Sequence, residues 1–233
     1  MICLDPRLTC AFNMLQGFDS VADIGSDHGK LTAALLFNGS CSRVIAGDIS
    51  PECLEKTRQL IDRCGLRDQA QVRLGSGLTV LAPGECKAAA ILGMGGELMV
   101  ELLEASSDVA ERMDKLVLQP MSGVEELRQW LYENEWRVLS DKLARVGKRW
   151  YQLLSVQKAD RADAWPEGFP ADCWLGGYRT LADRETGLPA YCREQLHKRQ
   201  ERLTKAIGTA GEEKITREAD QLEQILKEIE RWN

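Results

Sequence analysis

The sequence predicts an α/β fold: an open, mostly parallel β-sheet flanked by helices, followed by a C-terminal helical hairpin. Short strand-like apolar runs alternate with helix-like runs five times, which favours a parallel sheet with helices on both faces. Two further strand-like runs, 136–143 and 150–156, flank a glycine-bearing turn and predict a β-hairpin. Residues 188–207 and 215–232 read as two antiparallel helices, because the loop between them is short.

The expected elements follow one another in a regular order along the sheet-forming part. A helix over 6–17 comes first. Ser50 and Pro51 are a typical N-cap and first helical residue. The five parallel strands are expected at 20–24, 43–47, 70–74, 88–92 and 115–118, with helices at 30–37, from 51 to a stop near 65, at 97–104 and at 124–133, and with a glycine turn at 93–96.

A change of composition near residue 157 divides the chain into two predicted domains, 1–157 and 158–233. The segment 158–187 is expected to be a loosely packed connection. In the last helix, apolar residues spaced four and three apart predict a coiled-coil seam. The seam residues are Ile215, Ala219, Leu222, Leu226 and Ile229, and the first helix offers Leu188, Cys192, Leu196, Leu203 and Ile207.

Composition narrows the class of protein. The net charge of −6 argues against a generally basic nucleic-acid binder, although a local basic patch remains possible. No apolar run approaches the roughly 20 residues of a membrane helix, and the N-terminus does not resemble a signal peptide, so we expect a cytoplasmic protein. The eight cysteines are scattered, and the only histidines are His28 and His197. We therefore expect free thiols and no metal site.

Polar and glycine residues gather where the predicted strands end, which is where an open parallel sheet binds its ligands. Gly25 allows close approach of the backbone to a ligand. Asp48 follows it by about twenty residues, a spacing that suits an acid binding ribose hydroxyls. Asp48 could instead stabilise the next helix through its dipole, and His28 could be a packed or capping residue. The candidate ligand-binding residues are Asp23, Gly25, Ser26, His28, Asp48, Ile49, Ser76, Gly77, Gly93, Met94 and Gly95.

The first turn favours S-adenosylmethionine over a dinucleotide. The chain has no P-loop, and the turn lacks the G-x-G-x-x-G pattern of NAD-binding folds. An acid followed by glycine after the first strand, and a sheet that ends in an antiparallel pair, are typical of the seven-stranded sheet of class I methyltransferases. Asp23 could meet the cationic amino end of S-adenosylmethionine, since a sulfonium cofactor tolerates carboxylates where a pyrophosphate would not.

Five ordered blocks together resemble the bacterial tRNA (adenine-22-N1)-methyltransferase family. The blocks are Val21–His28, Ile45–Asp48, Val72–Leu78, Gly93–Gly96 and Leu116–Pro120, and the start Leu4-x-x-Arg7-Leu8 is similar as well. The resemblance covers residues 4 to about 157, while the C-terminal hairpin agrees in architecture more than in sequence. The chain departs from the family pattern at Lys30, Ser76 and Met121, which leaves open whether the target base is the same.

The resemblance implies methyl transfer from S-adenosylmethionine to N1 of an adenine in tRNA. N1 of neutral adenine carries a lone pair, so no strong base is needed, and a carboxylate would stabilise the cationic product. Asp27 is the candidate catalytic residue, in that role or as an acceptor for the exocyclic amine. Arg7, Lys30, Arg145 and Lys148 are candidate tRNA contacts.

Other interpretations of the sequence remain open. The chain could be a methyltransferase acting on a small molecule or a protein, or a non-catalytic adaptor that retains the fold. The C-terminal helices could hold tRNA or form a protein–protein surface. We expect a monomer or a weak homodimer that needs no metal and no membrane.

Overall fold

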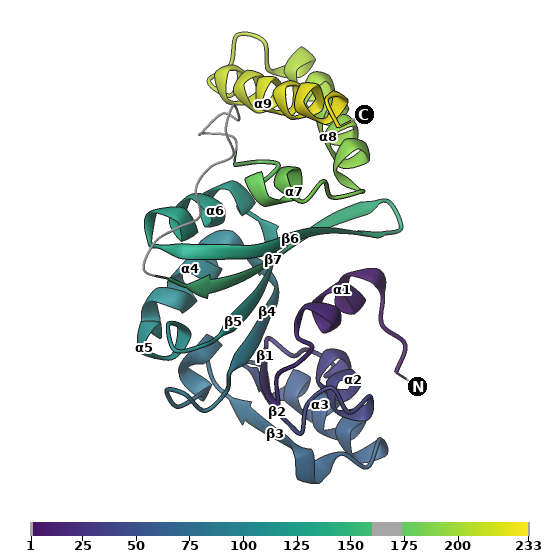
Figure 1. Ribbon diagram of the computed structural model, residues 1–233, viewed down its shortest axis with the longest axis vertical. Helices are drawn as coiled ribbons and strands as arrows, with labels where there is room; N and C mark the ends of the chain where they lie inside the picture. Colours follow the sequence, from purple (N-terminus) through teal and green to yellow (C-terminus); the bar gives the residue numbers. More distant parts are fainter. Residues whose placement is uncertain (1, 160–173, 233) are drawn as a thin grey trace.

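The structure, a computed structural model, describes residues 2–159 and 174–232 and contains a seven-stranded sheet flanked by helices (Figure 1). The strand order is β3-β2-β1-β4-β5-β7-β6. The first five strands run parallel, and β7 is antiparallel to both β5 and β6. This arrangement confirms the predicted Rossmann-like methyltransferase sheet. The strand order reverses at β1, which lies between β2 and β4, so the crevice for a ligand is expected there.

The predicted strands and helices are present. Most begin at the predicted residue, and most last residues differ from the prediction by a few positions. The strands are β1 (Ser20–Ile24), β2 (Arg43–Asp48), β3 (Ala70–Leu74), β4 (Ala88–Gly95), β5 (Lys115–Ser122), β6 (Trp136–Val146) and β7 (Arg149–Lys158). The helices are α1 (Pro6–Met14), α2 (Lys30–Phe37), α3 (Pro51–Arg63), α4 (Gly96–Ala105), α5 (Ser107–Ala110), α6 (Val124–Glu133), α7 (Tyr178–Ala182), α8 (Leu188–Ala206) and α9 (Glu212–Glu230), with 3-10 helices η1 (Arg67–Gln69) and η2 (Gly77–Val80).

A local cap explains the start of α3, and pairing with β5 corrects the predicted end of β4. Ser50 caps α3 by accepting a hydrogen bond from the Cys53 N–H (3.2 Å), with Pro51 at the first helical position, as predicted. The glycine stretch 93–96 is not a turn. It continues β4 to Gly95, and α4 begins directly at Gly96. Register shifts on either side of Met94 form a bulge that keeps this stretch paired with β5.

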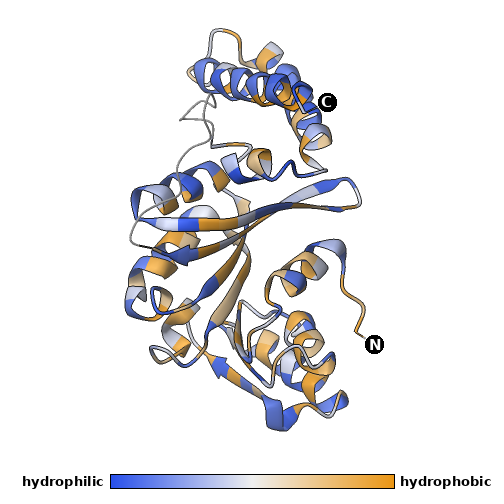
Figure 2. Cartoon of the chain, viewed as in Figure 1, coloured by the Kyte–Doolittle hydropathy of each residue, from blue (hydrophilic) through white to orange (hydrophobic). Residues whose placement is uncertain are grey.

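Two apolar layers cover the two faces of the sheet. Because side chains alternate along a strand, Val21 of β1 faces the layer of α1, α2 and α3, whereas Ala22 faces the layer that holds α4, α5 and α6. The hydrophobic residues concentrate on the central strands and on the helix faces turned toward them (Figure 2). No helix in the described ranges combines the length and the apolar character needed to cross a bilayer.

The C-terminal helices share their core with the sheet domain. Leu222, Ile225 and Ile229 of α9 belong to the same buried cluster as Leu154 and Val156 of β7. The predicted seam is mostly confirmed in α9, but Ile225 is more deeply buried than Leu226, which is only partly buried. The prediction was wrong for Ile207, which is 71% exposed because α8 ends at Ala206. The boundary between 1–157 and 158–233 remains a proposal.

The connection before α8 is well packed where it is described, which corrects the prediction of a loose segment. Arg128 of α6 is buried and donates hydrogen bonds to the carbonyls of Trp174 (2.8 Å) and Leu175 (3.1 Å). The same guanidinium pairs with the buried Asp141 of β6 at 2.6 Å. These bonds satisfy backbone groups that apolar periodicity does not reveal. Residues 160–173 of the segment, with Pro166, Pro170 and Cys173, lie outside the described part.

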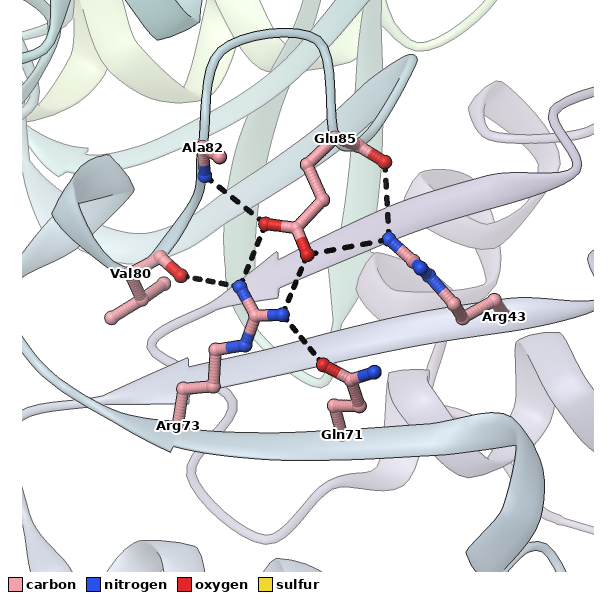
Figure 3. Close-up of polar contacts among 6 residues, drawn as sticks. All are labelled: Arg43, Gln71, Arg73, Val80, Ala82 and Glu85. Atoms are coloured by element: carbon pink, nitrogen blue, oxygen red, sulfur yellow. Dashed lines mark hydrogen bonds and ion pairs between the residues drawn. The ribbon is translucent and has the colours of Figure 1, made fainter.

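A polar cluster holds the loop before β4 on the edge of the sheet (Figure 3). Glu85 pairs with the Arg73 guanidinium through both carboxylate oxygens, at 2.6 and 2.7 Å, and accepts a hydrogen bond from the Ala82 N–H at 3.0 Å. Arg43 donates to the Glu85 carbonyl at 3.2 Å. The hydrogen bonds from Arg73 lower the pKa of Glu85 from 4.5 to about 2.

We predict that Glu85→Gln lowers the free energy of unfolding at pH 7 by about 2 kcal/mol, because a charge-assisted bidentate contact is lost. The pKa of Glu85 is lower in the folded protein than in the unfolded chain, from 4.5 to about 2, so its stabilisation is present above about pH 4.5 and fades toward pH 2. The free energies of unfolding of wild type and variant, measured in urea, should therefore converge as the pH falls. Glu101→Gln, at an exposed position of α4, is the control, and an equal loss there would contradict the prediction.

Candidate cofactor site

A cavity of about 500 Å³ lies at the carboxyl ends of β1, β2 and β4, beside α1 and β7. It brings together ten of the residues predicted from the sequence, eight for the cofactor and catalysis and two for tRNA. They are Asp23, Gly25, Ser26, Asp27, His28, Asp48, Gly93 and Met94, with Arg7 and Lys30. The cavity is thus at the reversal of strand order, where the fold predicts ligand binding.

Six predicted residues do not line this cavity. Ile49 directly follows Asp48 and is 72% exposed. Gly77 is buried, and a Cβ there would lie 2.5 Å from Leu102 Cδ2. Ser76 is exposed after β3, and Gly95 ends β4. Their cofactor roles remain predictions.

The other two, Arg145 and Lys148, lie on the β6–β7 hairpin. Arg145 is already engaged within the protein: it pairs with Glu194 at 3.5 Å and lies over the Trp150 ring at 5.2 Å. Lys148 is exposed at the tip of the hairpin. A contact of either residue with tRNA remains a prediction.

The Asp48 carboxylate holds two loops of the site together. Its Oδ2 accepts a hydrogen bond from the Asp27 N–H (3.1 Å), and its Oδ1 accepts one from the Ser50 N–H (2.9 Å). The loop after β1 therefore stays against the loop after β2. Each carboxylate oxygen has two lone pairs, so acceptor capacity remains for the hydroxyl groups of a ligand.

Asp23 is a buried acid at the floor of the cavity. It is 4% exposed, and its Oδ2 accepts hydrogen bonds from the Thr32 N–H (3.1 Å) and the Thr32 hydroxyl (2.6 Å). Burial raises the pKa of Asp23 to about 6, and the two bonds from Thr32 oppose that rise. A cationic ligand group would favour the ionised carboxylate.

Asp27 places a carboxylate at the mouth of the cavity. Its Oδ2 lies 2.8 Å from His28 Nδ1, and both side chains are more than half exposed. The half-exposed imidazole rules out a packed core role for His28. The backbone of Asp27 has φ +49°, in the left-handed region that non-glycine residues adopt uncommonly.

The backbone conformation at position 25 favours glycine, and a side chain there would also displace the end of Met94. Gly25 has φ +72°, and a Cβ there would lie 2.5 Å from the Cε of Met94. Gly25 and Met94 both line the cavity. A side chain at position 25 would thus enter the space that a ligand needs.

Two residues that contact Arg7, Tyr151 and Gln119, were not among the predicted site residues. Arg7 donates a hydrogen bond to the Gln119 Oε1 (2.9 Å), and its guanidinium lies over the Tyr151 ring at 5.6 Å. Both partners are neutral, so they hold the Arg7 cation in the cavity without neutralising it. Gln119 lies in the block Leu116–Pro120, whereas no local pattern marks Tyr151, which enters the cavity from β7.

The cavity is suited to an organic ligand rather than to a metal ion. Among residues 2–159 and 174–232, no group of three or more His, Cys, Asp or Glu side chains could hold a metal. The acids, the glycine backbone and the volume fit a nucleoside that carries a cationic group.

Residues 4–154 match a known family described as a methyltransferase domain. The chain belongs to this methyltransferase family. A tRNA (adenine(22)-N(1))-methyltransferase of Bacillus subtilis is 29% identical over 231 residues, which cover 97% of this chain and 96% of that protein. A putative tRNA methyltransferase of Mycoplasma genitalium is 26% identical over 156 residues, 65% of this chain and 69% of that protein.

Solved structures show the same architecture as this methyltransferase. The B. subtilis M1A22 tRNA methyltransferase superposes with a TM-score of 0.80 at 25% identity, over 99% of both chains. A Streptococcus pneumoniae protein described as a putative tRNA (m1A22) methyltransferase, solved with S-adenosyl-L-methionine, has a TM-score of 0.84 at 21% identity, over 96% of this chain and 100% of that one. The likeness to the latter establishes the shared fold.

We predict that Gly25→Ala weakens binding of S-adenosylhomocysteine about tenfold, because the new methyl group displaces the Met94 side chain, which lines the cavity. Isothermal titration calorimetry measures the change. Gly39→Ala is the matched control: Gly39 also has a positive φ, +65°, but a Cβ there meets nothing within 4 Å. Equal affinity losses in both variants would show that backbone strain alone, and not the cavity wall, is responsible.

Proposed function

We propose that this protein transfers a methyl group from S-adenosylmethionine to N1 of the adenine at position 22 of tRNA. The observation that carries the proposal is the cavity in which Asp23, Gly25, Asp27 and Asp48 meet at the reversal of strand order. The near full-length similarity to the B. subtilis enzyme supports the choice of tRNA and of the adenine. A cytoplasmic location and a monomeric or weakly dimeric state are part of the proposal.

Four residues suit the cofactor. When bound, S-adenosylmethionine supplies the methyl group on its sulfonium. The free acceptor capacity of Asp48 suits the two ribose hydroxyls, and Gly25 allows the backbone to lie against the ligand. Asp23, fixed by Thr32 and desolvated, suits the cationic amino group. Ile49, exposed directly after Asp48, would give the cofactor an apolar contact.

Asp27 suits the substrate. N1 of adenine needs no general base, because its lone pair lies in the plane of the ring and is free in the neutral base. The methylated product is cationic, so a carboxylate close to the base stabilises the charge as it develops. Asp27 is exposed at the mouth of the cavity. Its backbone is held there by the hydrogen bond to Asp48, and its carboxylate contacts His28 Nδ1 at 2.8 Å.

Of the four candidate cations, Arg145 is already paired with Glu194, and the other three lie at different places. Arg7 lies inside the cavity between neutral partners, so its charge is available to an oxyanion there. Lys30 lines the cavity as well, and Lys148 is exposed on the hairpin. Phosphate contacts of this kind position an RNA without reading its sequence.

Since N1 lies on the base-pairing edge, the target adenine must leave its pairing partner to reach the site.

The proposal predicts that the purified protein transfers labelled methyl from S-adenosylmethionine to bacterial tRNA, with the label at N1 of adenosine 22. Mapping the label by nuclease digestion and mass spectrometry checks the position. A transcript with guanosine at position 22 is the matched control and should accept no label. Transfer to proteins or small molecules, with none to tRNA, would favour one of the alternative methyltransferase classes.

Asp27→Asn should lower kcat for tRNA methylation about a hundredfold, because the amide keeps the shape but loses the charge that stabilises the product-like transition state. The affinity for S-adenosylhomocysteine should stay within about twofold of wild type. Asp68→Asn, an exposed acid in η1, serves as the control and should have wild-type activity. Undiminished turnover by Asp27→Asn would remove Asp27 from the mechanism.

A further inference from the structure

A second cavity, of about 300 Å³, opens between the sheet domain and the C-terminal helices. Its walls are the end of β5, the first turn of α6, Trp150 and Gln152 of β7, and the facing sides of α8 and α9. Ser122 and Lys214 lie on this wall and are exposed, so the cavity is accessible from solvent. None of the candidate residues named for the cofactor lines it.

The two cavities are neighbours at the same edge of the sheet. Met121 lines both of them and is 37% exposed. The two cavities meet at Met121 but lie on opposite faces of β7, since Tyr151 lines the first and Trp150 and Gln152 line the second. An RNA that fills both cavities passes Met121 at the end of β5.

The wall of the second cavity is rigid. The Arg199 guanidinium is held by Glu218 of α9 (3.0 Å) and by Gln195 of α8 (2.5 Å), and its side chain is 13% exposed. The rings of Trp150 and Tyr191 meet edge to face, with their centroids 6.1 Å apart. Gln152 is 7% exposed and donates to the Tyr191 hydroxyl, whereas its Oε1 has no hydrogen-bond partner among the described residues. Groups held in this way lose little entropy on binding.

The chemistry of the wall matches a nucleotide. Single-stranded RNA is bound through aromatic and guanidinium planes, hydrogen bonds to base edges and cations near the phosphates. Lys214 supplies a cation. Trp150 and Arg199 also line the wall, with the Arg145 guanidinium over the Trp150 ring and Arg199 paired with Glu218, and the acids Glu126 and Glu218 lie there too. Glu125 supplies an acceptor for the amino or imino hydrogens of a base, and burial, with Glu218 nearby, raises its pKa, so this carboxyl gains from a hydrogen-bond donor.

We infer that the second cavity binds the nucleotide of the substrate RNA that is adjacent to the methylated one. The inference rests on the proposed function, because it takes RNA methylation as given. It assigns the C-terminal helices a direct part in holding the substrate: α9 reaches the RNA through Lys214, and α6 faces it with Glu125 across the same cavity.

The first test compares two charge reversals on α9. Lys214→Glu should raise KM for tRNA about tenfold and leave the affinity for S-adenosylhomocysteine unchanged. Lys227→Glu makes the same change of net charge at an exposed position of α9 that does not line the cavity, and should raise KM less than twofold. Equal effects of the two substitutions would reduce the role of Lys214 to general electrostatics and would overturn the inference.

The second test asks whether a base occupies the cavity. tRNA carrying an abasic nucleotide on the 5′ or the 3′ side of the target adenosine is compared with intact tRNA, for wild type and for Glu125→Gln. If the cavity holds a neighbouring base, removal of that base lowers kcat/KM about tenfold for wild type and much less for Glu125→Gln, at one of the two positions only. If removal of either neighbouring base lowers kcat/KM by the same factor in wild type and in Glu125→Gln, the result contradicts the inference.

The two proposals fail in different ways. If wild type methylates no tRNA at all, the proposed function is wrong. If wild type methylates tRNA and the variants behave like their controls, the function holds and the assignment of the second cavity is wrong. A change in the affinity for S-adenosylhomocysteine in Lys214→Glu would place Lys214 in the cofactor site instead and would also overturn the inference.

Discussion

The carboxylate of Asp48 is the constraint on which the arrangement of the site depends. It ends β2 and accepts backbone hydrogen bonds from the loop after β1 and from the start of α3. The first of these bonds, together with the bond from the Thr57 hydroxyl to the Asp27 carbonyl (3.1 Å), holds Asp27 at φ +49°. A non-glycine residue in this conformation costs of order 1–3 kcal/mol, which the surrounding hydrogen bonds must offset. The position of the Asp27 backbone is therefore fixed by an acid in a different loop.

The rest of the fold places those loops and keeps the cavity open. The parallel strands bring the ends of β1, β2 and β4 together, and Asp23 is held in the floor by the first turn of α2. The bulge in β4 brings Gly93 and Met94 to the wall of the cavity while the strand remains paired with β5. Arg7 reaches the same cavity from α1, so an element outside the sheet completes the site.

The C-terminal helices are attached through buried polar bonds as well as apolar packing. The Arg128–Asp141 pair is almost fully buried, and a buried ion pair is weak evidence for stability because both charges are desolvated. The pair does fix the position of the segment that leads to α7 and α8, because the same guanidinium donates hydrogen bonds to two carbonyls of that segment. The second cavity, which lies between these helices and β5, depends on that position.

The sequence was sufficient to predict the elements that local patterns specify. Alternating strands and helices, the cap at Ser50 and the acids at the ends of β1 and β2 are all confirmed. Tertiary contacts decided the rest. Tyr151 reaches the cavity only because β7 inserts beside β5, and the packing of 174–187 depends on Arg128, which is distant in sequence. The stretch 93–96 predicted a turn, but pairing with β5 extends the strand to Gly95.

A crystal structure of this protein with S-adenosylhomocysteine would test the central claim most directly. The account predicts that both ribose hydroxyls lie within hydrogen-bonding distance of the Asp48 carboxylate, with the Asp27 backbone still bound to Asp48 and the amino group of the ligand at Asp23. A ribose bound elsewhere, or a loop after β1 that leaves Asp48 when the ligand binds, would contradict it.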